Sequence, residues 1–236
     1  MAPAIRLRSA VALAGHYPLL SGLDLDVAAG EVVLVRGANG AGKSSLLRVC
    51  AGLIPLSGGG GDVLGVDLYG DLRQLRRRIG LLGHASGLYD DLTVEDNVRF
   101  QVRAGRGTPD AVGPALEKLG LAGRLRTVAV HKLSAGQRRR AAIAALVARN
   151  PELWLLDEPH AGLDSEHRDL LDSLVRAAAA GGATVVLASH EAERAGLLAE
   201  RTVTVGGGTV VADTGPPAPP GPPGGTEPEP QAAHVA

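Results

Sequence analysis

Residues 32–50 read VVLVRGANGAGKSSLLRVC, and this stretch decides the fold. The apolar run over 32–35 predicts a buried strand, and apolar residues at helical spacing predict a helix over 43–50. Between them, residues 37–44 match the pattern G-x-x-x-x-G-K-S/T. A strand, a glycine-rich loop and a helix in this order are typical of a phosphate-binding loop.

The glycine-rich loop is predicted to bind a nucleoside triphosphate through its backbone. Glycines let the chain curl so that successive N–H groups point at phosphate oxygens, and the following helix adds its positive N-terminal end. Lys43 can reach the β- and γ-phosphates, and the Ser44 hydroxyl can bind Mg²⁺. The chain has only three lysines, which makes a chance match to the pattern rare. The residues predicted here to bind ATP are Gly37, Ala38, Asn39, Gly40, Ala41, Gly42, Lys43, Ser44 and Ser45.

A pair of carboxylates follows a second apolar strand. Residues 153–156, LWLL, lead directly into Asp157 and Glu158. Because adjacent strand residues point to opposite sides, Asp157 can face Mg²⁺ while Glu158 reaches the water that attacks the γ-phosphate. An acidic pair alone is also typical of a turn. Together with the phosphate loop, it predicts ATP hydrolysis with Glu158 as the base and with Ser44 and Asp157 as metal ligands.

Predicted strands alternate with predicted helices, which favours a parallel α/β sheet covered on both faces. Short strands are expected over 5–11 and 23–27, and the four glycines at 58–61 are expected to form a flexible tip. Helices with little strand are expected between 93 and 149. This order indicates an α/β protein, a P-loop NTPase core sheet with an antiparallel β edge and an α-helical insertion.

The chain is expected to divide into three parts. Residues 1–84 and 151–213 are predicted to form the nucleotide-binding α/β core, and residues 85–150 an α-helical subdomain. Residues 214–236 are rich in proline and glycine, which predicts a disordered tail.

The composition argues against several other classes of protein. A hydrophobic fraction of 45% can fill a packed core, whereas an aromatic fraction of 2% argues against stacking nucleic-acid bases on rings. The net charge of -1 gives no general attraction to nucleic acid. The single cysteine, Cys50, excludes an intrachain disulfide and favours the cytoplasm. No segment has the roughly 18 apolar residues of a membrane span, so we expect any membrane role to depend on a partner.

Residues 133–137, LSAGQ, resemble the LSGGQ signature of ABC ATPases, with alanine in place of one glycine. Taken alone, the segment predicts only a helix that begins after an N-cap serine. The resemblance covers roughly residues 4–213 and implies the ABC ATPase fold, with ATP and Mg²⁺ as cofactors. It also implies a head-to-tail dimer, in which the signature of one subunit covers the γ-phosphate held by Lys43 of the other. The signature residues are Leu133, Ser134, Ala135, Gly136 and Gln137.

The resemblance also implies partners and a location. The partners are an integral membrane permease and a second ATP-binding subunit, with no nucleic acid, and the location is peripheral, at the cytoplasmic face of the cell membrane. Residues 88–92, LYDDL, stand where the family forms the groove for the permease. Asp164 resembles the D-loop residue that faces the partner subunit. His190 resembles the switch histidine that contacts the γ-phosphate, so Glu158, His190 and Lys43 form the predicted catalytic set.

Two positions depart from the family pattern. His84 stands where the family normally carries glutamine, at the coupling loop between the sheet and the helical insertion. Its imidazole can still approach Mg²⁺ or the lytic water and form one hydrogen bond there. The alternative role for His84 is that of a polar loop residue without a function in catalysis. Tyr17 is the only ring suited to stack on adenine, but it stands about three residues later than the family's aromatic residue. Packing within the protein is the alternative role for Tyr17.

Four short strings resemble a narrower group, the ATP-binding subunit of the cytochrome c maturation haem exporter, the CcmA type. They are Ser21-Gly22-Leu23, Gly83-His84, the LSAGQ segment and Arg138-Arg139. The alternatives are another ABC exporter, of drugs, lipids or polysaccharides, or a soluble mechanical ABC ATPase acting on ribosomes or DNA. The mechanical enzymes usually have two cassettes or a long coiled-coil insert, which this chain lacks. A small P-loop kinase is a further alternative, but it would not need LSAGQ.

Overall fold

This computed structural model describes residues 3–215 of the chain, which form two β-sheets and the helices around them. The strands are β1 (Pro3–Ala14), β2 (Tyr17–Ala28), β3 (Val32–Arg36), β4 (Gly58–Val63), β5 (Val66–Asp67), β6 (Ile79–Leu82), β7 (Leu153–Asp157), β8 (Thr184–Ala188), β9 (Arg201–Gly206) and β10 (Thr209–Asp213). Of the segment predicted to be a disordered tail, residues 216–236 lie outside the described residues.

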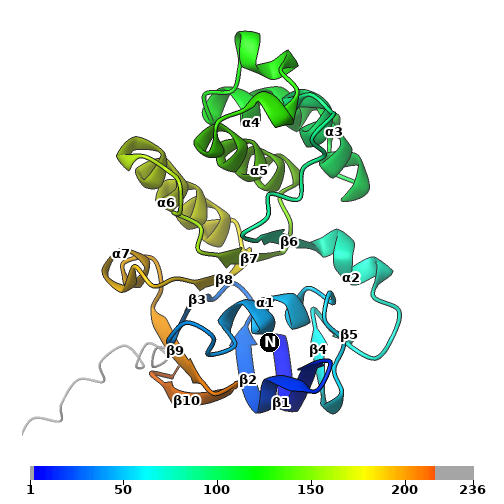
Figure 1. Cartoon of the computed structure of the whole chain (residues 1–236), viewed down its shortest axis with the longest axis vertical. Helices are drawn as coiled ribbons and strands as arrows, with labels where there is room; N and C mark the ends of the chain where they lie inside the picture. The colour runs from blue at the N-terminus through cyan, green and yellow to red at the C-terminus, as the bar shows by residue number, and fades with distance from the viewer. Residues whose placement is uncertain (1–2, 216–236) are drawn as a thin grey trace, which may run out of the picture.

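Three of the α-helices gather at one end of the molecule (Figure 1). The helices are α1 (Lys43–Cys50), α2 (Arg73–Arg78), α3 (Val94–Ala104), α4 (Val112–Lys118), α5 (Ala135–Arg149), α6 (Ser165–Ala180) and α7 (Ala192–Gly196), with 3-10 turns at Pro109–Ala111, Gly123–Thr127 and Val130–Lys132. In Figure 1, α3, α4 and α5 lie at the end opposite β1, β2 and β10. Within residues 3–215, no helix combines the length and the apolar character needed to cross a bilayer.

The larger sheet has six strands in the order β10-β9-β3-β8-β7-β6. Its neighbouring strands are parallel except for β10, which is antiparallel to β9. Every residue of β7 and of β8 is buried, as expected for parallel strands covered on both faces. The predicted fold class, a parallel α/β core with an antiparallel edge, is confirmed.

The smaller sheet is antiparallel, with strands in the order β2-β1-β4-β5. The expected flexible tip at residues 58–61 is wrong, because these glycines form most of β4 and pair with β1. A Cβ on Gly59 would lie 2.0 Å from the carbonyl oxygen of Ser9, and one on Gly61 would lie 2.7 Å from that of Arg6. The glycines therefore allow two backbones to approach more closely than larger residues permit.

The helices α3, α4 and α5 pack on one another, and α5 also packs on β6. Thr93 caps α3, since its hydroxyl accepts a hydrogen bond from the Asp96 N–H at 3.1 Å. The buried Asn97 of α3 fastens the preceding loop, because its side-chain amide donates to the carbonyls of Tyr89, Leu92 and Thr93. The apolar core of these helices is continuous with α6 and with one face of the larger sheet.

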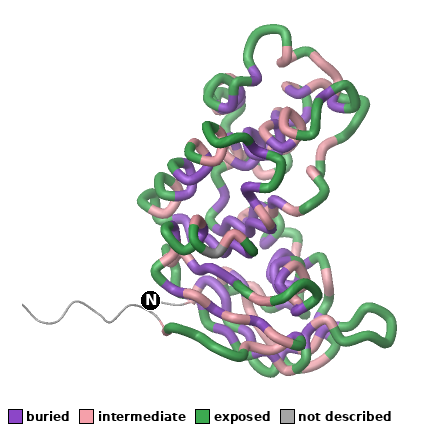
Figure 2. Tube along the Cα trace, turned by 60° about the vertical axis from the view of Figure 1, so that its left-hand side comes forward, coloured by how far each residue is buried: buried purple, intermediate pink, exposed green. Residues whose placement is uncertain are grey.

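A second apolar cluster fills the space between the two sheets and contains the buried side of α1. In Figure 2 the buried positions follow the inner sides of the strands and helices, and the exposed positions gather on loops and outer helix faces. The residues of α1 in this cluster are Leu46, Leu47, Val49 and Cys50. This packing fixes the start of α1, and with it the glycine-rich loop, relative to both sheets.

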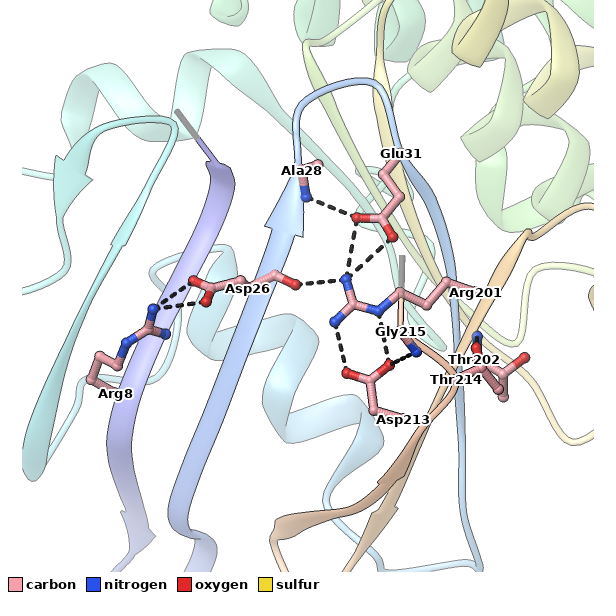
Figure 3. A network of polar contacts seen from close by, with 9 residues as sticks. All are labelled: Arg8, Asp26, Ala28, Glu31, Arg201, Thr202, Asp213, Thr214 and Gly215. Atoms are coloured by element: carbon pink, nitrogen blue, oxygen red, sulfur yellow. Dashed lines mark hydrogen bonds and ion pairs between the residues drawn. The ribbon is translucent and has the colours of Figure 1, made fainter. Parts of the chain in front are cut away.

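Arg201, the first residue of β9, joins several segments through one guanidinium (Figure 3). It donates to Asp213 at 2.9 and 2.7 Å, to Glu31 at 3.2 and 3.3 Å and to the Asp26 carbonyl at 2.9 Å. Arg201 is only 7% exposed, and its bond to Asp213 is the main cause that raises the pKa of Arg201 and lowers that of Asp213. The network fastens β9 and β10 to the end of β2 and the start of β3.

Candidate nucleotide-binding site

The loop between β3 and α1 curls around three glycines. Gly37, Gly40 and Gly42 have φ angles of 148°, 78° and 110°, which lie in the region that favours glycine. A Cβ on Gly37 would lie 2.2 Å from the carbonyl oxygen of Val205, and one on Gly42 would lie 2.9 Å from that of Leu19. The loop therefore needs glycine at both positions. It ends at the N-terminus of α1, whose free N–H groups favour an anion.

Lys43, the first residue of α1, points back into this loop. Its side chain is largely buried, and Nζ donates to the carbonyl oxygens of Gly37 at 2.8 Å and Ala38 at 3.0 Å. The ammonium is thus held by the curled loop, where a triphosphate would be surrounded by backbone N–H groups. A compact charge at this place suits phosphate oxygens.

Ser44, the second residue of α1, contacts the end of β7. Its hydroxyl donates to Oδ1 of Asp157 at 3.0 Å, and the Asp157 side chain is buried. A hydroxyl and a carboxylate at this distance are oxygen ligands of the kind Mg²⁺ uses in sites completed by phosphates and water. The two side chains therefore fit a magnesium ion.

Glu158 follows β7 directly and has a φ angle of 46°, a left-handed conformation that is costly for residues other than glycine. Its N–H donates to the Ala188 carbonyl at 2.8 Å, which continues the pairing of β7 with β8. Its carboxylate accepts the His190 N–H at 3.1 Å, and His190 Nδ1 lies 2.8 Å from Oε2. The end of β7 and the loop after β8 thus bring together the predicted base and the predicted switch histidine.

One cavity of about 320 Å³ joins the phosphate loop to the acidic pair. The residues predicted for ATP and metal that line it are Asn39, Gly40, Ala41, Gly42, Lys43, Ser44, Ser45, Asp157 and Glu158. Pro18 and Leu19 of β2 also line it, and the sequence analysis did not single them out. The available signal was their place directly after Tyr17. Tyr17 itself is 79% exposed and is not among the lining residues, so its proposed contact with adenine stays a prediction.

The signature segment starts α5. Ser134 is the N-cap, its hydroxyl accepts the Gln137 N–H at 3.2 Å, and its own N–H donates to the Gln137 side chain at 3.0 Å. This reciprocal pair is a capping box. Leu133 is buried, whereas Ser134 and Ala135 are exposed. A Cβ on Gly136 would lie 3.1 Å from the Gly162 carbonyl oxygen, so the signature segment lies directly beside the residues just before Asp164.

A second cavity, of about 280 Å³, brings His84 close to the acidic pair. His84 is exposed and lines this cavity together with Ala135, Arg139, Asp157 and Glu158. The cavity thus connects the predicted coupling loop, the signature segment and the predicted base. Arg139, a buried cation at this point, is a residue that the sequence analysis noted only as part of an arginine run.

Asp164 of the predicted D-loop caps α6. Its side chain accepts the His167 N–H at 2.9 Å and lies 2.7 Å from His167 Nδ1. These bonds, the backbone bond first, lower the pKa of Asp164. The Asp164 side chain is 68% exposed, which leaves one side of the carboxylate accessible.

The fold and the cavity around Lys43, Ser44 and Asp157 define a phosphate-loop nucleotide-binding protein. A family model described as ABC transporter matches residues 20–161. This chain belongs to the ABC transporter family, as an ATP-binding and ATP-hydrolysing subunit. The resemblance drawn from the LSAGQ segment is therefore confirmed at the level of the family.

Similar proteins cover most of the chain. The cytochrome c biogenesis ATP-binding export protein CcmA of Bordetella bronchiseptica is 42% identical over 171 residues, which cover 71% of this chain and 75% of that protein. The protein of the same name from Xanthomonas campestris pv. campestris is 38% identical over 205 residues, 86% of this chain and 94% of that protein. These relatives agree with the narrower resemblance noted from the sequence.

Solved structures share the fold. A dimeric ATP-binding cassette in a post-hydrolysis state, bound to ADP and Pi, has a TM-score of 0.81 at 26% identity. The alignment covers 89% of this chain and 97% of the cassette chain. The ATP-binding subunit of an ABC transporter has a TM-score of 0.83 at 24% identity and covers 89% of either chain.

Proposed function

We propose that this subunit hydrolyses ATP to drive a membrane permease that exports haem for cytochrome c biogenesis. The main observation that supports an ATPase site is the hydrogen bond between Ser44 and Asp157, in the same cavity as Lys43 and Glu158. The relatives named as cytochrome c biogenesis export proteins support the export role.

Each group of the site has a task in this proposal. The backbone N–H groups of residues 37–45 and the Lys43 ammonium bind the phosphates of ATP. Mg²⁺, when bound by Ser44 and Asp157, neutralises charge on the phosphate oxygens. Glu158 accepts a proton from the attacking water, and His190, hydrogen-bonded to Glu158, contacts the γ-phosphate.

We also propose that two copies close head to tail around ATP. Ser134 and Ala135 are exposed and do not line the cavity that holds Lys43 of the same chain. Their position at the N-terminus of α5 suits them to bind the γ-phosphate of a second copy. Asp164 would face that copy from the D-loop. The dimeric state of a similar cassette bound to ADP and Pi supports this arrangement.

We also propose separate roles for two parts of the chain. Residues 1–84 and 151–213 act as the nucleotide-binding core, and residues 85–150 act as a helical subdomain that receives the permease at the cytoplasmic face of the membrane. His84 acts at the junction between these two parts, where it lines a cavity with Glu158.

A complementation experiment tests the proposed function. Deletion of the gene is expected to abolish haem-stained c-type cytochromes. The wild-type chain is expected to restore them, and the Glu158→Gln variant is expected not to restore them. Glu117→Gln, at an exposed position of α4, is the matched control and should restore them fully. Normal cytochromes c in the deletion strain would exclude haem export and favour another ABC exporter. Full ATP turnover by purified Glu158→Gln would exclude the catalytic assignment itself.

A further inference from the structure

The side chain of Arg139 is a buried cation without a carboxylate partner among the ion pairs of residues 3–215. It belongs to α5 and is only 8% exposed. Burial lowers its pKa, while the nearby charges of Asp157 and Glu158 act in the opposite direction. Such a residue needs hydrogen-bond acceptors inside the protein.

Four backbone carbonyls provide those acceptors. Nη1 donates to the Gly83 oxygen at 2.7 Å, and Nη2 donates to the Asp157 oxygen at 3.2 Å and the Glu158 oxygen at 2.7 Å. Nε donates to the Pro159 oxygen at 3.3 Å. One planar guanidinium therefore holds the strand end before His84 and three consecutive carbonyls around the predicted base.

The held segment is the strained part of the site. Glu158, whose φ angle is 46°, lies in the chain between Asp157 and Pro159, and Arg139 binds the carbonyls of both neighbours. A left-handed conformation at a residue other than glycine persists only where surrounding contacts hold it. The Arg139 bonds on both sides of Glu158 are contacts of this kind.

We propose that Arg139 is a positioning residue for ATP hydrolysis, which holds the backbone of Glu158 and ties it to the loop of His84. This inference rests on the proposed role of Glu158 as the base. Arg139 stands five residues after the N-cap Ser134, on the same helix. A movement of the signature helix or of the His84 loop therefore reaches the Glu158 backbone through one side chain.

The inference is tested with Arg139→Gln in the full chain. We expect kcat for ATP to fall at least about tenfold while the Kd for ATP changes less than about threefold, because a group that acts only on the hydrolysis step leaves binding intact. ATP with Mg²⁺ should then accumulate a dimer of the variant on size-exclusion chromatography. A variant that was merely destabilised would not show this split between binding and turnover.

Arg149→Gln is the matched control at the other end of α5. Arg149 also has a pKa lowered by burial and also donates to backbone carbonyls, those of Arg76 and Arg77, but it lines neither cavity around Glu158. We expect this control to lose stability as Arg139→Gln does and to keep kcat within about twofold. Equal loss of kcat in the two variants, or unchanged kcat in Arg139→Gln, would overturn the inference.

Two further variants keep the outcome decisive. If Arg139→Gln does not fold, Arg139→Lys is used, because a single ammonium cannot reproduce the planar fork. A kcat at least about threefold below wild type with unchanged Kd supports the inference, and a wild-type kcat overturns it. Glu158→Gln is measured in parallel. Normal turnover in Glu158→Gln would refute the proposed base, whereas loss there with normal turnover in Arg139→Gln and Arg139→Lys would refute only the role of Arg139.

Discussion

The imidazole Nδ1 of His190 lies 2.8 Å from Oε2 of Glu158, so the loop after β8 holds the carboxylate that follows β7. The His190 N–H also donates to this carboxylate, at 3.1 Å. A side-chain substitution removes the first contact and keeps the second. The two contacts can therefore be separated by experiment.

His190→Ala is expected to lower kcat by roughly 100-fold or more, because an orienting or proton-transfer group in contact with the base is lost. The side chain of His190 is 68% exposed, so the melting temperature should stay unchanged. Steady-state ATPase assays and thermal unfolding measure the two effects. Wild-type turnover in this variant would show that the imidazole plays no part in hydrolysis.

Asp157→Asn should raise the Mg²⁺ concentration for half-maximal ATP turnover by at least about tenfold, because a neutral amide is a weaker magnesium ligand than a carboxylate. The bond from Ser44 at 3.0 Å can still form, which preserves the end of β7. A magnesium titration of ATPase activity measures the shift. Asp110→Asn, at an exposed 3-10 turn, serves as the control and should leave the magnesium curve unchanged.

Tyr17→Ala should weaken ATP binding by about 5- to 150-fold if the ring stacks on adenine, the range that base–aromatic stacking supplies. The ring is 79% exposed, which leaves its face free for a base. Tyr17→Phe should bind ATP like wild type, and inorganic triphosphate should bind equally to all three proteins. Equal ATP affinity in Tyr17→Ala would show that binding rests on the phosphates.

The sequence was sufficient for elements whose signals are local. The helix over 43–50 and the strands at Val32–Arg36 and Leu153–Asp157 form where the apolar pattern placed them. The contact between Ser44 and Asp157 was expected because a phosphate loop and an acidic strand end have few other uses together. Each motif was recognised from neighbouring residues in the chain, although Ser44 and Asp157 themselves are 113 positions apart.

Two features that depend on distant partners and on no recognised motif were missed. The glycines at 58–61 form a strand because β1 lies against them, and nothing in their own composition indicates a strand. Arg139 was grouped with Arg138, although its bonds reach carbonyls 18 to 56 residues away. A run of arginines does not tell which guanidinium is buried, because burial is set by the packing of α5 on the strand ends.

Cys50 should be unreactive in the folded protein. Burial on α1 raises the pKa of its thiol to about 12, so almost no thiolate is present near neutral pH. A colorimetric thiol reagent at about pH 8 should titrate the thiol only in denaturant. Because the ordinary value is 9.0, the unfolded chain ionises first, and this thiol should lower the free energy of unfolding between pH 9 and about 12. Cys50→Ala should remove that part of the pH dependence.

Arg201→Met should destabilise the protein by about 3–5 kcal/mol, because it leaves the carboxylates of Glu31 and Asp213 without their shared cation. Arg8→Met is the matched control in the same network (Figure 3), since the pair of Arg8 with Asp26 is exposed and should contribute much less to stability. Denaturant unfolding of both variants gives the comparison. Equal free energies of unfolding for the two variants would show that burial adds nothing to the Arg201 network.

Arg201→Met should also change how the free energy of unfolding depends on pH. The bond to Arg201 lowers the pKa of Asp213 below its ordinary value of 3.8. The folded chain therefore keeps this carboxylate ionised where the unfolded chain binds a proton, and the stabilisation is present above pH 3.8 and lost as pH falls through the lowered pKa. Wild type should thus lose stability more steeply than Arg201→Met below about pH 4. Parallel acid-unfolding curves for the two proteins would contradict the assignment of this ion pair.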